Sequence, residues 1–187
     1  MPSYVDKFLA ALGLVVLSPV LLAFAIWIKL DSRGPVIYRQ LRVGKDGRIF
    51  EMLKLRTMKE GSDPVGVGTA VGRGDARVTR PGELMRRASI DEIPNLVNVL
   101  RGEMAIVGPR PALPAHLDYF GLHGHPRFEV LPGITGWAQV KGRADITWPE
   151  RVELDDWYVA HRTPALDLRI IGMTILPVLT GKGVSPD

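Results

Sequence analysis

The feature that most constrains this chain is a long apolar run without charged residues near its N-terminus. Phe8 to Ile28 is 21 residues without a charged side chain, bounded by Lys7 and Lys29. As a straight helix it would be about 32 Å long, enough to cross the hydrocarbon core of a bilayer. A cleaved signal peptide fits less well. Asp6 and Lys7 cancel ahead of the run, and the apolar residues continue past the cleavage-like Ala23-Phe24-Ala25.

The run is interrupted in its middle by Ser18-Pro19. Proline removes an amide donor and clashes with the preceding turn of a helix. Two structures follow from this. One is a kinked helix that spans the bilayer. The other is a helix–break–helix hairpin that enters and leaves the same leaflet, because each half is too short to span. The flanking charges are too few to decide between them.

Charge is concentrated in the part of the chain that follows. Residues 35–90 contain twelve basic and six acidic side chains, whereas residues 91–187 contain nine basic and twelve acidic. A basic region of this size indicates an anionic partner: nucleic acid, lipid headgroups or a phosphorylated small molecule. The chain has no cysteine, which excludes disulfides, a thiolate nucleophile and Cys-ligated metal.

The remainder predicts an α+β fold. A β-hairpin is expected from residues 35–40 and 48–56, with the turn at 44–47, and Lys54 and Arg56 on one face. The glycines at 66, 68 and 72 do not have dinucleotide-binding spacing. Helical patterns follow from residue 82, over 151–162 and over 166–179, the last as an interfacial or core helix. We expect residues 1–33 to anchor the chain in the membrane and residues 34–187 to form a globular domain, which would hold any catalytic site.

An adjacent carboxylate pair, Asp91-Glu92, is the strongest candidate for chemistry. Ser89 and Glu92 have the spacing of a capping box, which would make the pair structural. Pro94 would then fall inside the helix, whereas a helix that begins near Pro94 leaves the pair at its entrance. There, one carboxylate could attack phosphorus while the other holds a metal. Several cations that suit phosphate accompany the pair in the sequence: Lys54, Arg56, Arg86, Arg87 and Arg110.

These segments together resemble the small monotopic phosphoglycosyl transferases, the bacterial sugar transferases that act on undecaprenyl phosphate. The matching pieces are Ser18-Pro19, residues 54–58, 75–79, 86–98, 102–104, 107–111, 132–140, 142–143, 153–155 and 157–159. No further apolar span precedes the first one, which points to the minimal catalytic form. The chain departs from the family pattern in having Asn95 where glutamine is more common.

The resemblance implies a function and a set of roles. Such enzymes transfer a phosphosugar from a UDP-sugar to polyprenol (undecaprenyl) phosphate and release UMP. Asp91 would be the nucleophile that carries the phosphosugar, and Glu92, with Asp91, would ligate Mg²⁺. Ser18-Pro19 would form a re-entrant hairpin on the cytoplasmic face of the bacterial inner membrane. Arg143 would join the phosphate-binding cations.

Other interpretations are weaker or remain open. A membrane-anchored basic scaffold is the main alternative, and it leaves the carboxylate pair unexplained. The chain has no recognisable nucleic-acid-binding motif, and the apolar run also argues against nucleic-acid binding. His116, His123 and His125 could ligate metal, but they lie in a Gly/Pro-rich segment with no nearby carboxylate pattern. The sugar is not encoded in any readable motif, and a homodimer remains open.

Overall fold

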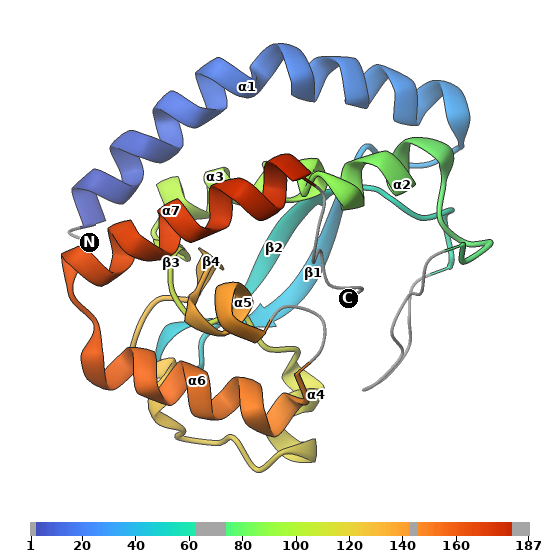
Figure 1. Cartoon of the computed structure of the whole chain (residues 1–187). Coiled ribbons are helices and arrows are strands. Elements are labelled where there is room, and N and C mark those ends of the chain that lie inside the picture. Colours follow the sequence, from blue (N-terminus) through green and yellow to red (C-terminus); the bar gives the residue numbers. More distant parts are fainter. Residues whose placement is uncertain (1–2, 63–73, 143–145, 181–187) are drawn as a thin grey trace.

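The computed structural model describes residues 3–62, 74–142 and 146–180, the last five of these by their backbone alone. The fold is mixed α+β, as predicted, with two small sheets surrounded by helices (Figure 1). The elements in chain order are α1 (Ser3–Asp31), β1 (Ile37–Val43), η1 (Lys45–Gly47), β2 (Ile49–Leu55), α2 (Arg80–Arg87), η2 (Ile90–Glu92), α3 (Asn95–Arg101), β3 (Ala105–Val107), α4 (Pro114–Tyr119), η3 (Pro126–Phe128), β4 (Gly133–Thr135), α5 (Trp137–Gly142), α6 (Trp148–His161) and α7 (Pro164–Thr180).

The apolar run forms α1, a single helix that arches over the rest of the molecule (Figure 1). It is long and apolar enough to cross a membrane by length and composition. The predicted break at Ser18-Pro19 is not an interruption of the helix. Pro19 cannot donate to the carbonyl of Val15, but the Ser18 hydroxyl donates to that oxygen instead, at 2.8 Å. The side chain thus replaces the missing backbone bond, and the re-entrant hairpin itself is not shown.

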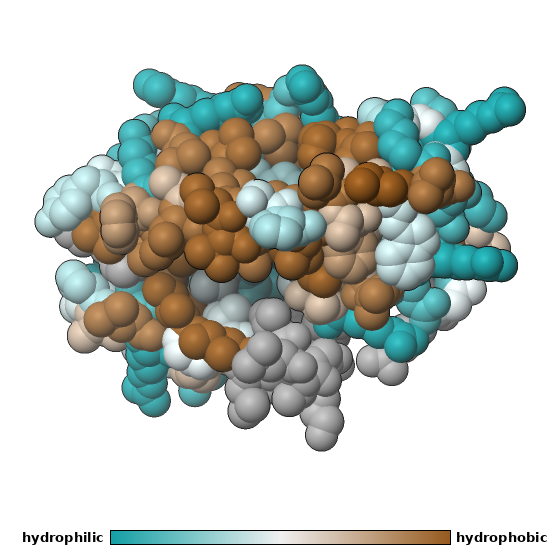
Figure 2. All heavy atoms as spheres, turned by 90° about the horizontal axis from the view of Figure 1, so that it is seen from above, coloured by the Kyte–Doolittle hydropathy of each residue, from teal (hydrophilic) through white to brown (hydrophobic). Residues whose placement is uncertain are grey.

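Both halves of α1 pack against the same body. Ala10 is fully buried in a cluster with Phe50 and Met52 of β2. Ile28, near the other end, is buried with Leu55 and Met85. Many other apolar side chains of α1 are exposed, among them Phe8, Val15 and Leu22, and Figure 2 shows a broad hydrophobic face on this side of the molecule. The helix is therefore attached to the body near both of its ends.

The predicted β-hairpin is confirmed. Strands β1 and β2 pair antiparallel from Ile37↔Leu55 to Val43↔Ile49. The turn requires left-handed backbone at Asp46 (φ 55°) and Gly47 (φ 73°), which explains the Asp-Gly sequence there. The side chain of Asn98, on α3, hydrogen-bonds to the backbone of β2 in the way that a third strand would. Its side-chain oxygen accepts from the Leu53 amide at 3.1 Å, and its nitrogen donates to the Glu51 carbonyl at 2.7 Å.

The second sheet is a short parallel pair, β3 with β4. Gly108 and Gly133 allow the two segments to approach closely, because a Cβ on Gly133 would lie 2.1 Å from the Gly108 nitrogen. Helices α5, α6 and α7 pack beside this sheet through Trp137, Tyr158 and Ile170. The predicted helix over 166–179 is α7, which has both a buried residue and exposed apolar ones.

Candidate functional site

The carboxylate pair lies in η2, a single 3₁₀ turn between α2 and α3. The capping-box interpretation is wrong. Ser89 has left-handed backbone (φ 53°), its side chain makes no capping bond, and α3 begins after Pro94. Left-handed backbone at a non-glycine residue is uncommon and costs free energy, and such residues gather at functional sites. The pair therefore stands at the entrance of α3, as the alternative interpretation predicted.

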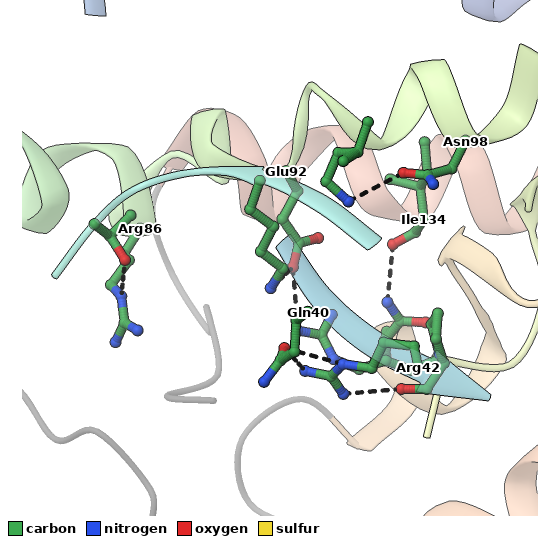
Figure 3. A network of polar contacts seen from close by, with 12 residues as sticks. Gln40, Arg42, Arg86, Glu92, Asn98 and Ile134 are labelled. Atoms are coloured by element: carbon green, nitrogen blue, oxygen red, sulfur yellow. Dashed lines mark hydrogen bonds and ion pairs between the residues drawn. The ribbon is translucent and has the colours of Figure 1, made fainter. Parts of the chain in front are cut away.

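Asp91 and Glu92 point in different directions, because consecutive residues of a 3₁₀ turn are about 120° apart. Asp91 is buried, at 5% exposure. Glu92 Oε1 accepts from two cations, Lys54 Nζ at 3.0 Å and Arg110 NH2 at 3.1 Å. A carboxylate held by two cations is fixed in orientation, and the cations remain close enough to contact an anionic ligand. Figure 3 shows Glu92 with Arg86 on one side and Arg42 on the other.

The turn that carries Arg110 is held by two buried guanidinium groups. Arg127 NH2 donates to the Arg110 carbonyl at 2.9 Å, and Arg42 NH1 donates to the Pro111 carbonyl at 3.0 Å. Arg42 also donates twice to Gln40 Oε1, at 3.0 and 2.6 Å (Figure 3). These bonds fix the backbone at Arg110 and Pro111, and this backbone position directs the Arg110 side chain toward Glu92.

Arg127 is itself paired with Asp155 of α6, at 2.9 Å, and both side chains are only 1% exposed. Burial raises the pKa of Asp155 to about 6 and lowers the pKa of Arg127. The sequence pattern assigned no role to Arg42 or Asp155, and it left Arg127 as either a nucleotide-binding or a solvated side chain. The only available signals were the polar alternation of Gln40 and Arg42 on a strand and the place of Asp155 in a family motif.

The structure places the other predicted cations differently. Arg86 donates to the Thr57 hydroxyl at 3.1 Å, and Arg87 forms an exposed pair with Glu83 on α2. Arg56 follows the end of β2 and donates to the carbonyls of Ser32, at 2.9 Å, and Arg33 at the end of α1. Among the predicted phosphate-binding residues, Lys54 and Arg110 contact Glu92. Arg143 lies outside the described residues.

The three histidines do not converge. His116 packs against Trp148, and burial lowers its pKa to about 4. His123 pairs with Asp118 on the surface, and His125 lies 3.4 Å from Asp156. Across the part of the chain that the structure describes, no three His, Asp or Glu side chains gather as a metal site. Asn95 is buried, and its Oδ1 has no hydrogen-bond partner among those residues.

Two carboxylates without a third protein ligand suit Mg²⁺ that is shared with a substrate. Mg²⁺ prefers oxygen ligands and is usually held by one or two carboxylates together with phosphates and waters. Asp91 and Glu92 carry carboxylate oxygens of this kind, and the cations beside Glu92, Lys54 and Arg110, suit a phosphate. The arrangement is suited to phosphoryl transfer, which depends on positioning and on neutralisation of charge.

Comparison with known proteins gives a consistent result. The profile described as "Bacterial sugar transferase" matches residues 1–181. A protein named as the uncharacterized sugar transferase EpsL of Bacillus subtilis is 40% identical over 176 residues, 94% of this chain and 86% of that protein. The exopolysaccharide production protein ExoY of Sinorhizobium fredii is 35% identical over 192 residues, 95% of this chain and 85% of that protein.

Relatives whose names state a reaction are also similar. A UDP-glucose:undecaprenyl-phosphate glucose-1-phosphate transferase of Caulobacter vibrioides is 43% identical over 183 residues, 94% of this chain and 68% of that protein. The chain spans much less of some longer relatives, for example 38% of the transferase of the same name from Xanthomonas campestris.

Proposed function

Because this chain belongs to the bacterial sugar transferase family, we propose that it transfers a sugar 1-phosphate from a UDP-sugar to undecaprenyl phosphate. The products are undecaprenyl diphosphate-sugar and UMP. The observation that carries the proposal is the buried Asp91 next to Glu92, whose carboxylate is held by Lys54 and Arg110 at 3.0 and 3.1 Å. The names of similar proteins supply the donor and acceptor classes.

In the proposed mechanism an Asp91 carboxylate oxygen attacks the phosphorus that bears the sugar. The bond from that phosphorus to the bridging oxygen breaks, and UMP leaves with the electron pair. An oxygen of undecaprenyl phosphate then attacks the same phosphorus and releases the Asp91 carboxylate. Splitting the transfer in this way lets donor and acceptor use one site in turn.

The cations of the site would bind the phosphates. Lys54 and Arg110 are the best supported, since both already contact a carboxylate oxygen. Arg56, Arg86, Arg87 and Arg143 complete the proposed set. Asp91 and Glu92 would hold Mg²⁺, which when bound would neutralise charge on the donor diphosphate.

We also propose that α1 is a re-entrant membrane helix on the cytoplasmic face, so that the enzyme is monotopic. Two observations support this. The Ser18 hydroxyl satisfies the Val15 carbonyl where Pro19 cannot donate to it. Ala10 and Ile28, toward opposite ends of α1, are both buried against the same body. Attachment of both ends of α1 to one body would keep both ends on the same side of the bilayer.

The test is UMP release by purified protein in detergent or lipid, with Mg²⁺, undecaprenyl phosphate and a panel of UDP-sugars. We expect release with at least one sugar, loss of release with EDTA, and recovery on adding Mg²⁺. Asp91→Asn should reduce the rate by roughly a thousandfold or more, because it removes the nucleophile. Asp118→Asn, at an exposed carboxylate, is the matched control and should be active. Wild-type rates in a folded Asp91→Asn variant would contradict the mechanism and favour a scaffold role.

A further inference from the structure

An apolar groove of about 360 Å³ lies between α1 and the catalytic body. Every residue that lines it is apolar. One wall is formed by α1, including Leu21 and Ala25. The opposite wall combines the open end of the β-hairpin, at Ile37 and Leu55, with Pro94 and Val97 from the start of α3.

The groove and the carboxylate pair share this second wall. Leu55 lines the groove, whereas its neighbour Lys54 contacts Glu92. Consecutive residues of a strand point to opposite faces, so the end of β2 has an apolar face toward the groove and a cation toward the site. Pro94 likewise lines the groove only two residues after Glu92. A ligand that passes around this end of the sheet can therefore contact both.

We propose that the groove binds the phosphate-proximal part of the acceptor's isoprenoid chain, while Lys54 and Arg110 receive its phosphate. The inference rests on the proposed function, which supplies an acceptor with one anionic end and a long hydrocarbon chain. That chemistry matches a cationic cluster that adjoins an entirely apolar groove. Four of the residues that line the groove belong to α1, and the face of the molecule on which α1 lies is broadly hydrophobic (Figure 2), so a lipid-borne chain would approach from this side.

The test fills the groove and separates the two half-reactions. Ala25→Phe places a large side chain in the groove, and Ala23→Phe makes the same change at an exposed position two residues away. Single-turnover UMP release without acceptor reports the first half-reaction and also shows that each variant is folded. Steady-state turnover with undecaprenyl phosphate then gives the KM for the acceptor.

We expect Ala25→Phe to raise the acceptor KM roughly tenfold, as expected when about two methylene groups lose their burial. Its UMP burst should equal that of the wild type. Ala23→Phe should change neither value. Ile37→Ala, on the opposite wall, should also raise the acceptor KM and spare the burst. Equal acceptor KM values for Ala25→Phe, Ala23→Phe and wild type would overturn the inference. The groove would then contact ordinary bilayer lipid and not the acceptor. Absence of a burst in the wild type would instead overturn the proposed two-step function, and this inference with it.

Discussion

Removing one partner of the buried ion pair between Arg127 and Asp155 should destabilise the fold strongly, because the other charge is then buried without its partner. Both side chains are 1% exposed, and the guanidinium lies over the Trp148 ring at 5.1 Å. Asp155→Asn keeps the shape of the side chain but leaves a buried guanidinium without its main counter-charge. Breaking a buried pair in this way typically costs about 3–5 kcal/mol. Asp156 also acts on Arg127, so we expect about 3 kcal/mol.

Urea denaturation in one detergent, followed by tryptophan fluorescence, measures this loss. In a chain of 187 residues the same change corresponds to a fall in Tm of about 6–12 °C. Asp156→Asn is the matched control. Its side chain is 42% exposed, and it should change stability by less than about 1 kcal/mol.

A double variant separates stability from positioning. Arg127→Met with Asp155→Leu should recover most of the stability, because apolar replacements of buried pairs are often neutral or stabilising. The same variant removes the hydrogen bond from Arg127 to the Arg110 carbonyl, so its rate of UMP release should be lower than that of the wild type. A free energy of unfolding for Asp155→Asn within about 1 kcal/mol of the wild-type value would refute the view that this buried pair holds the Arg110 turn in place.

Three further outcomes are expected. Asn98→Leu should cost about 3 kcal/mol in urea denaturation, because it leaves buried backbone groups of β2 unpaired. His116 has a folded pKa of about 4, below its ordinary 6.5. As the pH is lowered, His116 therefore binds a proton in the unfolded chain before it does so in the folded chain. The free energy of unfolding should decrease by about 3 kcal/mol between pH 6.5 and pH 4. His116→Phe should remove that part of the pH dependence. Ser18→Ala should lower Tm in detergent, because the Val15 carbonyl loses its partner, whereas Ser18→Thr should not.

Local patterns predicted much of this structure. The alternation and the Asp-Gly turn predicted the β-hairpin and its second strand, whereas the first strand runs from Ile37 to Val43 rather than over 35–40. Pro94 indicated where α3 could begin, and that placed Asp91-Glu92 at a helix entrance. These features depend on residues close together in sequence, which is why periodicity and turn chemistry could locate them.

Tertiary contacts explain what local patterns missed. Arg127 and Asp155 come from separate segments, and charged residues are normally expected at the surface. The side chain of Asn98 meets the backbone of β2, a segment more than forty residues earlier in the chain, rather than solvent. Arg56 was expected to share a face with Lys54. Strand β2 ends at Leu55, so Arg56 instead contacts carbonyls at the end of α1.

The central claim is that Asp91 carries the phosphosugar, and intact-mass spectrometry tests it most directly. The protein would be incubated with Mg²⁺ and an accepted UDP-sugar without acceptor, then digested to locate the modification. The account predicts a mass increase of one phosphosugar on the peptide containing Asp91, its loss when undecaprenyl phosphate is added, and its absence in Asp91→Asn. Turnover without any adduct, or an adduct at another residue, would contradict it.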